Sequence, residues 1–242
     1  MLLCAYDIET TGLDREKSLI TEIGLCLYST EQNRILESAG FLVQPVGVPI
    51  TPQITELTGI TQSAVDRFGY SQEDAVASFI DFAEKADAII GHNSNSFDLP
   101  IIQNSAKRAC RVLPAKLSID TMTDIPGVKG EQLITMCAKA GFVYEAHGAL
   151  PDAMAVLKLA AFHAHRSIVT TYERIMERAK SPLVVLQSHQ SRQDNAAAKQ
   201  AKFRWNDPLK GWYKIVKEID IPDLEFSFRV SRADKDVFPV WD

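Results

Sequence analysis

Residues 2–12 read LLCAYDIETTG, an apolar run that ends in two acidic side chains. Residues Leu2–Ile8 alternate too little for a half-exposed strand, so we expect a strand that is buried on both faces. Two further β-rich runs, Ile20–Tyr28 and Ile35–Val43, follow within hairpin distance and predict an antiparallel three-stranded meander. Side chains two apart on a strand point the same way, so Asp7 and Glu9 should project together from its carboxyl end.

Helical patterns and short apolar runs alternate after the meander. Two short strands are expected at Ala88–Gly91 and Leu117–Asp120. Helices are expected at Pro52–Thr58, Gln62–Asp66, Ser71–Ala83, Asp98–Arg111, Glu131–Ala140, Pro151–Arg166 and Ser167–Lys180. This order predicts an α/β fold in which helices flank a mixed central sheet.

The composition is that of an ordinary globular protein with a full core. The chain has 242 residues, of which 46% are hydrophobic and 24% charged, which excludes a disordered chain, a collagen and a disulfide miniprotein. The 26 Lys and Arg residues face 31 Asp and Glu residues, a net charge of −5. By itself that sign argues against a nucleic-acid binder, because phosphates attract cations.

The cysteines and the N-terminus bear on the cellular location. Four cysteines lie far apart, with no C-x-x-C pair, and are interpreted as reduced, mostly buried thiols: Cys4, Cys26, Cys110 and Cys137. The first apolar run meets Asp7 and Glu9 before a signal sequence could form, and no membrane span is recognisable. We therefore expect a cytoplasmic protein with no membrane partner.

The composition changes near residue 188. Residues Ser188–Lys202 are rich in Gln, Ser, Ala and basic side chains, which predicts a linker or exposed helix. Phe203–Trp205 and Trp212–Val216 then suggest a β-hairpin, and the alternation over Leu224–Val230 suggests a third strand. We expect two domains, residues 1–182 and a small β-rich appendage at residues 183–242.

The hairpin region is locally basic. Between Arg192 and Lys217 there are seven Lys and Arg residues but two Asp residues, interleaved with aromatic rings. Such a mixture suits single-stranded nucleic acid, because cations bind phosphates and rings stack on bases. The alternative is that the rings form the core of a small β-unit, and both can hold. The candidate contacts are Lys202, Arg204, Trp205, Lys210, Trp212 and Lys214.

Asp7 and Glu9 are the first candidates for chemistry. Two carboxylates at such a distance repel each other unless a cation lies between them. Mg²⁺ and Mn²⁺ prefer oxygen ligands and keep water molecules that a phosphate can replace. Taken alone, however, the pair also fits two solvated acids at the end of a strand.

Two later segments place further polar side chains at the ends of regular elements. The run GHNSNSFD, residues 91–98, leads from a strand to a helix, and its Asp98 could be a ligand or, with Ser96, a helix cap. The run HGALPDA, residues 147–153, puts Asp152 in the first turn of a helix with His147 just before it. A first-turn Asp often does no more than complement the helix dipole.

Together, D-x-E, N-x-x-x-F-D and H-x-x-x-x-D in this order resemble the DEDD superfamily of 3′→5′ exonucleases, in the branch with a catalytic His. That branch includes the proofreading epsilon subunit, exonuclease X and RNase T. The resemblance covers about residues 1–165, and Ile20–Gly24, Gly59–Thr61 and Asp120-Thr121 match the family between the motifs. It implies an RNase H-like exonuclease fold.

The resemblance also implies a role for individual residues. Asp7, Glu9, Asp98 and Asp152 would hold two divalent cations, Mg²⁺ or Mn²⁺, and His147 would be the general base. Other matching positions would shape the pocket for the terminal nucleotide: Thr10, Thr11, Gly12, Leu13, Asn93 and Phe97, the last of which equally fits the core. Gly148 departs from the family, which often has a larger residue there; we expect a flexible loop in which His147 is ordered only with substrate.

The expected function is a metal-dependent 3′→5′ exonuclease that acts on DNA, single-stranded or frayed, and releases nucleoside 5′-monophosphates. Trimming of RNA is the alternative within this class, since no residue is seen to read the 2′-hydroxyl. A non-catalytic nucleic-acid-binding or replisome-tethering module is the rival outside it. A homodimer and a replication or repair partner also stay open. Two bound cations would reverse the sign of charge at the site, which answers the objection raised by the net charge.

Overall fold

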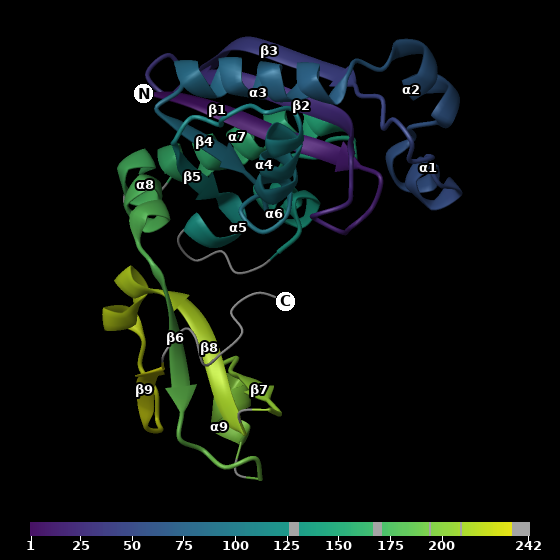
Figure 1. Cartoon of the computed structure of the whole chain (residues 1–242). Coiled ribbons are helices and arrows are strands. Elements are labelled where there is room, and N and C mark those ends of the chain that lie inside the picture. The colour runs from purple at the N-terminus through teal and green to yellow at the C-terminus, as the bar shows by residue number, and fades with distance from the viewer. Residues whose placement is uncertain (126–130, 167–170, 194, 209, 234–242) are drawn as a thin grey trace. The chain divides into compact units, whose positions relative to one another are not determined.

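The computed structural model describes residues 1–125, 131–166, 171–193, 195–208 and 210–233. The chain divides into two compact units, Met1–Ala179 and Lys180–Asp242, which are described separately below (Figure 1). No helix in the described ranges is long and apolar enough to cross a membrane.

The first unit is built on a five-stranded mixed sheet with the order β3-β2-β1-β4-β5. The strands are β1 (Leu2–Thr10), β2 (Ile20–Ser29), β3 (Arg34–Leu42), β4 (Ala88–Gly91) and β5 (Leu117–Asp120). The first three form the expected antiparallel meander, and β4 and β5 continue the sheet parallel to β1. The predicted fold, a mixed central sheet flanked by helices, is confirmed.

The helices begin and end close to the expected positions. They are α1 (Pro52–Thr58), α2 (Gln62–Phe68), α3 (Gln72–Lys85), α4 (Asp98–Arg108), α5 (Thr121–Asp124), α6 (Leu133–Lys139), α7 (Ala149–Arg166) and α8 (Tyr172–Lys180). Ser71 forms a capping box with Asp74 at the start of α3. The short helix α5 was not predicted, and residues 167–170 of the last expected helix lie outside the described residues.

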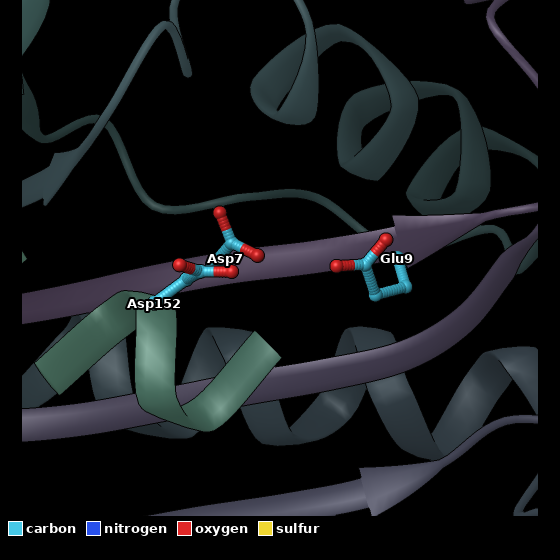
Figure 2. A group of neighbouring side chains, drawn as sticks. All are labelled: Asp7, Glu9 and Asp152. Carbon is cyan, nitrogen blue, oxygen red and sulfur yellow. The ribbon is translucent and has the colours of Figure 1, made fainter. Parts of the chain in front are cut away.

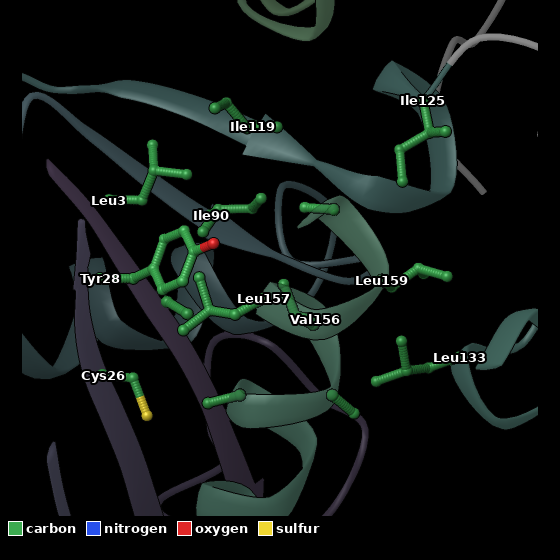
Figure 3. Close-up of a cluster of buried hydrophobic side chains, with 14 of the residues drawn as sticks. Leu3, Cys26, Tyr28, Ile90, Ile119, Ile125, Leu133, Val156, Leu157 and Leu159 are labelled. Atoms are coloured by element: carbon green, nitrogen blue, oxygen red, sulfur yellow. The ribbon is translucent and has the colours of Figure 1, made fainter. Parts of the chain in front are cut away.

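Strand β1 is buried on both faces, which explains why its sequence does not alternate. Leu3 and Ala5 belong to a hydrophobic cluster with α6, α7 and α8, part of which is drawn in Figure 3. Cys4, Tyr6 and Ile8 belong to a second cluster with α3 and α4. The apolar run therefore fixes β1 in the middle of the unit, and its carboxyl end carries Asp7 and Glu9 into the same environment.

The N-terminal end of α7 lies directly against β2. A Cβ atom on Gly24 would come within 2.2 Å of the Ala149 carbonyl carbon, a distance that real side chains do not reach. One strand further out, a Cβ on Gly40 would lie 2.9 Å from the Leu150 Cβ. Glu22 accepts a hydrogen bond from the Ala149 backbone N–H at 2.9 Å. Because β2 pairs with β1, these contacts set the position of α7 relative to Asp7 and Glu9.

The close approach at Gly24 makes it a sensitive position. Gly24→Ala should lower the free energy of unfolding by about 1–3 kcal/mol, because the new methyl group meets backbone atoms that cannot rotate away. Urea unfolding measures this change. Gly12→Ala is the matched control: its Cβ would lie 3.6 Å from the Ser18 Oγ, an ordinary contact, so its stability should stay within about 0.5 kcal/mol of the parent protein. Equal stabilities of the two variants would contradict the close packing.

The second unit is a four-stranded antiparallel sheet with the order β7-β8-β6-β9. Its elements are β6 (Leu183–Ser188), α9 (Ala196–Gln200), β7 (Arg204–Asn206), β8 (Gly211–Lys217), the 3₁₀ helix η1 (Glu218–Asp223) and β9 (Val230–Ala233). The predicted hairpin is confirmed as β7 and β8. The expected linker contains α9, and β6, an unpredicted strand, is the central partner of β8 and β9.

The expected strand over Leu224–Val230 is wrong. Only Val230 of that segment belongs to a strand, and β9 begins there. Leu224, Phe226 and Phe228 alternate because their side chains pack into a cluster with Phe203 and Trp212. No strand among the described residues pairs with the backbone of these three residues. The alternation reports burial on one side, which is necessary for a half-buried strand but does not prove one.

Candidate metal and catalytic site

Three carboxylates meet at the carboxyl end of β1. Asp7 and Glu9 project from the strand, and Asp152 projects from the first turn of α7, so that one oxygen of each lies within 4.8 Å of the others (Figure 2). Two sequence features bring them together. The two-residue period of β1 puts the side chains of Asp7 and Glu9 on the same face of the strand. The close packing of the start of α7 against β2 brings Asp152 near them.

Asp98 lies beside this group at the start of α4. Its side chain is 4% exposed, and it accepts a hydrogen bond from the Ile8 backbone N–H at 3.2 Å, between Asp7 and Glu9 on β1. The capping interpretation is wrong, because the N-cap residue is Phe97 and no side chain caps this helix end. Ser96 instead donates to the backbone and side-chain oxygens of Asn93. Burial of Asp98 against β1 thus needs another explanation than helix capping.

The pKa values of three of the four acids, Asp7, Glu9 and Asp98, are raised. Burial is the largest cause for each, and repulsion among the carboxylates adds to it: the pKa of Asp7 lies well above its ordinary value, that of Glu9 is raised to about 8, and that of Asp98 to about 7. In the described part of the chain, neither Asp152 nor any of these three forms an ion pair with Lys or Arg. Asp7, Glu9 and Asp98 can therefore lose their protons only at a cost in free energy, unless cations enter.

The donor set fits hard divalent cations. Every candidate ligand atom is a carboxylate oxygen, and the three-residue group contains no thiol or imidazole that would favour a softer metal. Asp7, Glu9 and Asp152 could share an ion at the separations observed, and Asp98 lies close enough for its charge to raise the pKa of Asp7. The four acids named from the sequence are thus brought together, three within one cluster and the fourth at its border.

Asp152 is held by two hydrogen bonds. The Tyr144 hydroxyl donates to its Oδ1 at 2.5 Å, and the His147 backbone N–H donates to its Oδ2 at 3.0 Å. Tyr144 was not foreseen from the sequence, because it lies eight residues before Asp152 in a loop without a regular period. These two bonds orient the carboxylate toward β1 and tie it to the loop that carries His147.

The His147 side chain is exposed and stands in the loop before α7. His147 itself adopts a left-handed conformation with φ 69°, and a Cβ on Gly148 would meet only the Pro151 ring at 3.4 Å. The loop is held on both sides of Gly148, by His147 N–H to Asp152 and by Ala149 N–H to Glu22. The expectation that substrate orders His147 is left as a prediction.

The expected substrate residues of the β1 end form a turn after the strand. The Thr10 hydroxyl donates to the Gly12 carbonyl at 2.7 Å, and Thr11 Oγ1 accepts from the Leu19 backbone N–H at 3.0 Å. The Leu13 side chain is 85% exposed, an unusual position for leucine next to a polar cluster. This turn therefore presents backbone and an apolar side chain beside the carboxylates.

The second expected substrate segment is the loop from β4 to α4. Asn93 is exposed with φ 57°, and Phe97 is half-buried against the cluster that contains Ile8. An acid that the sequence did not identify as functional organises this loop. Asp120, at the end of β5, accepts the backbone N–H groups of Asn93 at 2.8 Å and Asn95 at 3.2 Å. Asp120 on β5 and Glu22 on β2 therefore both bind the backbone of segments that carry candidate site residues.

The six candidate contacts of the second unit do not form one surface. Trp212 is 4% exposed and belongs to the core of this unit, so the expectation that it contacts nucleic acid is wrong. The Lys214 ammonium donates to the Ala201 carbonyl at 2.8 Å and lies over the rings of Phe203 and Phe226. Three side chains, Lys202, Arg204 and Lys210, are exposed, and Trp205 is half-buried. The interpretation of the rings as a small core is confirmed for Phe203 and Trp212.

The raised pKa values predict how the stability of the metal-free protein depends on pH. A carboxyl that holds its proton more tightly in the folded state loses stabilisation as pH rises from its unfolded to its folded pKa, which for Glu9 spans 4.5 to about 8. The free energy of unfolding should therefore fall from pH 5 to pH 8, by at most about 1.4 kcal/mol per pH unit for each group. Urea unfolding in EDTA measures it.

The same unfolding experiment is repeated with one variant and with Mg²⁺ in place of EDTA. Glu9→Gln removes one titrating group and should make the decline shallower, and Mg²⁺ should raise the stability of the parent protein most at pH 8, where protons no longer compete. A stability that rises over this range in EDTA, or a variant with the parental slope, would contradict the assigned pKa shifts.

Comparison with known proteins places the first unit in a family. The RNase T family model, described as exonuclease, matches residues 4–160. The PolC-type DNA polymerase III of Caldanaerobacter subterraneus subsp. tengcongensis is 36% identical over 103 residues, which cover 43% of this chain and 7% of that protein. The PolC-type enzyme of Mycoplasma pneumoniae is 30% identical over 145 residues, or 58% of this chain and 10% of that protein. The chain thus spans about a tenth of these relatives.

Solved structures share the fold. Escherichia coli exonuclease I in complex with a dA16 oligonucleotide aligns with a TM-score of 0.59 at 18% identity, covering 78% of this chain and 48% of that one. The nuclease domain of 3′hExo, a DEDDh family member bound to rAMP, aligns with a TM-score of 0.56 at 21% identity, covering 66% of this chain and 90% of that one. With a family model that matches well over half of its length, the chain belongs to the RNase T family of exonucleases.

Proposed function

We propose that this exonuclease removes nucleotides from the 3′ end of DNA, single-stranded or frayed, and releases nucleoside 5′-monophosphates with two divalent cations, Mg²⁺ or Mn²⁺. The observation that carries the proposal is the convergence of Asp7, Glu9 and Asp152, with Asp98 beside them, at one end of a buried strand. Such a concentration of unpaired acid is unfavourable in itself and becomes favourable when cations and a phosphate share the space.

Asp7, Glu9 and Asp152 would hold the cations, and Asp98 would complete the site. When bound, the cations would stabilise the negative charge that develops on the phosphate and the leaving oxygen. Contacts within the chain hold the four carboxylates in place: β1 fixes Asp7 and Glu9, the Ile8 N–H orients Asp98, and the Tyr144 hydroxyl orients Asp152.

His147 would accept the proton of the attacking water. Imidazole exchanges protons near neutral pH, and this one is exposed at the end of α7 that carries Asp152. Its backbone N–H binds Asp152 directly, so the loop links the position of the base to that of a metal ligand. Leu13, Thr10 and Thr11 at the β1 turn, with Asn93 and Phe97 across the site, would bind the terminal nucleotide.

The comparisons support nucleic acid as the substrate but do not distinguish DNA from RNA. The relatives in sequence are named DNA polymerases, and one solved structure holds a DNA oligonucleotide. Another holds rAMP, which favours trimming of RNA as the second candidate. A purely tethering module would be expected to lack one of the five candidate residues, and this chain has all of them.

The role of Asp7 is tested by its isosteric amide. Asp7→Asn keeps the shape of the side chain but removes its charge, and should reduce hydrolysis of a labelled oligonucleotide to the background of the assay. Asp81→Asn, on the exposed side of α3, removes the same charge away from the site and should keep the parental rate. Substantial activity of Asp7→Asn would rule out the proposed metal site.

The role of His147 is tested by its pH profile. His147→Ala keeps the backbone N–H that binds Asp152, so the variant loses the imidazole alone. We expect a rate lower by about 10²–10⁴-fold at neutral pH, rising with pH as hydroxide replaces the base. Val143→Ala, an exposed position of the same loop, is the control. An unchanged rate at pH 7 would exclude His147 as the base.

One time course tests the direction of cleavage, the preference for DNA or RNA, and the requirement for a divalent cation. Oligomers of DNA and RNA labelled at the 5′ or the 3′ end are incubated with Mg²⁺, Mn²⁺ or EDTA. The proposal expects a ladder from 5′-labelled DNA, immediate release of a mononucleotide from 3′-labelled DNA, and neither in EDTA. Faster cleavage of RNA would favour the second candidate, and internal cuts would contradict an exonuclease.

A further inference from the structure

A buried arginine joins α8 to the short helix α5. Arg178, in α8, is 7% exposed. Its Nε donates to the Asp124 carbonyl at 3.2 Å, and its Nη2 donates to the Thr123 carbonyl at 3.0 Å, at the end of α5 (Figure 1). A guanidinium that is removed from water needs such acceptors, because buried donors without a partner are costly. These two bonds therefore hold α5 against α8.

Helix α5 is bound to the end of β5 through two buried acids. Asp124 is fully buried, and its Oδ2 accepts the Asp120 backbone N–H at 2.9 Å. Asp120 is also buried, and its Oδ1 accepts both the Met122 N–H at 3.0 Å and the Asn93 N–H at 2.8 Å. A movement of α5 must therefore shift the acceptors that Asp120 offers to the loop before α4. Asp120 is thus the link between α5 and this loop.

The conformation of the loop before α4 depends on this link. Asp120 accepts the backbone N–H groups of Asn93 and Asn95, and Thr121 Oγ1 lies 2.9 Å from Nδ1 of His92. Asn93 has φ 57°, a left-handed conformation that costs free energy in a residue with a side chain. The bonds to Asp120 offset that cost. The shape of the loop is therefore set by residues at the junction of β5 and α5.

We propose that Arg178 is a positioning residue of the site: through α5 and Asp120 it fixes the loop that carries Asn93. Three successive hydrogen bonds carry the effect, from Arg178 to the Asp124 carbonyl, from the Asp120 N–H to the Asp124 carboxylate, and from the Asn93 N–H to the Asp120 carboxylate. The expected effect on hydrolysis rests on the proposed function, in which Asn93 binds the terminal nucleotide, whereas the expected effect on the loop does not.

Hydrogen exchange of single amides, followed by NMR in the metal-free protein, tests the effect on the loop. Arg178→Met keeps an extended side chain but removes its hydrogen-bond donors. The Asn93 and Asn95 amides should then exchange at least about tenfold faster, because local opening becomes easier when buried hydrogen bonds are lost. The Ala149 amide, which binds Glu22 elsewhere in the same unit, should keep its rate. Equal acceleration of all three amides would show a general loss of stability and would overturn the proposal.

The matched control is Arg174→Met. Arg174 lies in the same helix but is more exposed and pairs with Glu177 at 2.6 Å, so its loss should leave the exchange of the loop amides unchanged. The same acceleration in this control would contradict a specific role of Arg178. If Arg178→Met is unfolded, Arg178→Lys repeats the measurement: the charge stays, but an ammonium lacks the forked contact of a guanidinium. Its loop amides should exchange faster than those of the parent protein, and parental rates would overturn the proposal.

Steady-state hydrolysis of a labelled oligonucleotide with Mg²⁺ tests the effect on the site. Arg178→Met should raise KM by about 3–10-fold and change kcat by less than about twofold, because a displaced Asn93 weakens binding rather than the chemical step. An unchanged KM in an active variant whose loop amides exchange faster would overturn the positioning role. If the parent protein shows no hydrolysis, the proposed exonuclease function fails, and the exchange result stands independently.

A double variant tests whether Arg178 acts through Asp120. Asp120→Asn removes the charge of the acceptor that binds the loop and should itself raise KM. In Arg178→Met/Asp120→Asn, KM should rise by less than the product of the two single effects, since both substitutions weaken the same succession of bonds. An increase equal to the full product would show two independent effects and would contradict the proposed path.

Discussion

Mutual repulsion of closely spaced carboxylates is the constraint around which the first unit is arranged. Asp7, Glu9 and Asp152 lie within 4.8 Å of one another, and Asp98 is buried against the backbone of the same strand. Each of these groups would be more stable in water, and no Lys or Arg in the described ranges pairs with them. Their positions are tolerated because the surrounding hydrophobic clusters and backbone contacts hold the elements that carry them.

Those contacts come mainly from strands that contribute no acid to the cluster. The start of α7 packs against the backbone of β2 at Gly24 and donates a hydrogen bond to the Glu22 carboxylate. Asp120 on β5 accepts a hydrogen bond from the loop before α4. The site is therefore a property of the sheet as a whole: β1 supplies two acids, and β2 and β5, on opposite sides of it in the sheet, hold the segments next to the other two. A substitution on β2 or β5 can disturb the geometry without touching a candidate ligand.

The sequence predicted what depends on local pattern. The buried strand β1, the three-stranded meander and the helix that follows Ser71 were predicted from burial on both faces, strand propensity and helix pattern, and three spaced motifs identified the candidate acids. The positioning roles of Tyr144, Glu22 and Asp120 could not be predicted, because each depends on a contact with a backbone or carboxylate group that folding brings near. The strand predicted over Leu224–Val230 was wrong because an alternating pattern indicates burial on one side and not strand pairing. The predicted nucleic-acid contact of Trp212 was wrong because a ring on a strand can face either the core or the solvent.

The central claim is that cations replace protons in a preformed group of carboxylates. Isothermal titration of the intact chain with Mn²⁺ in buffers of different ionisation enthalpy tests it most directly, since the dependence on the buffer gives the number of protons released. The raised pKa values of Glu9 and Asp98 predict release of at least about one proton per chain at pH 6.5, and less release at pH 9. Binding without proton release at pH 6.5, or no binding of Mn²⁺ at either pH, would contradict the account.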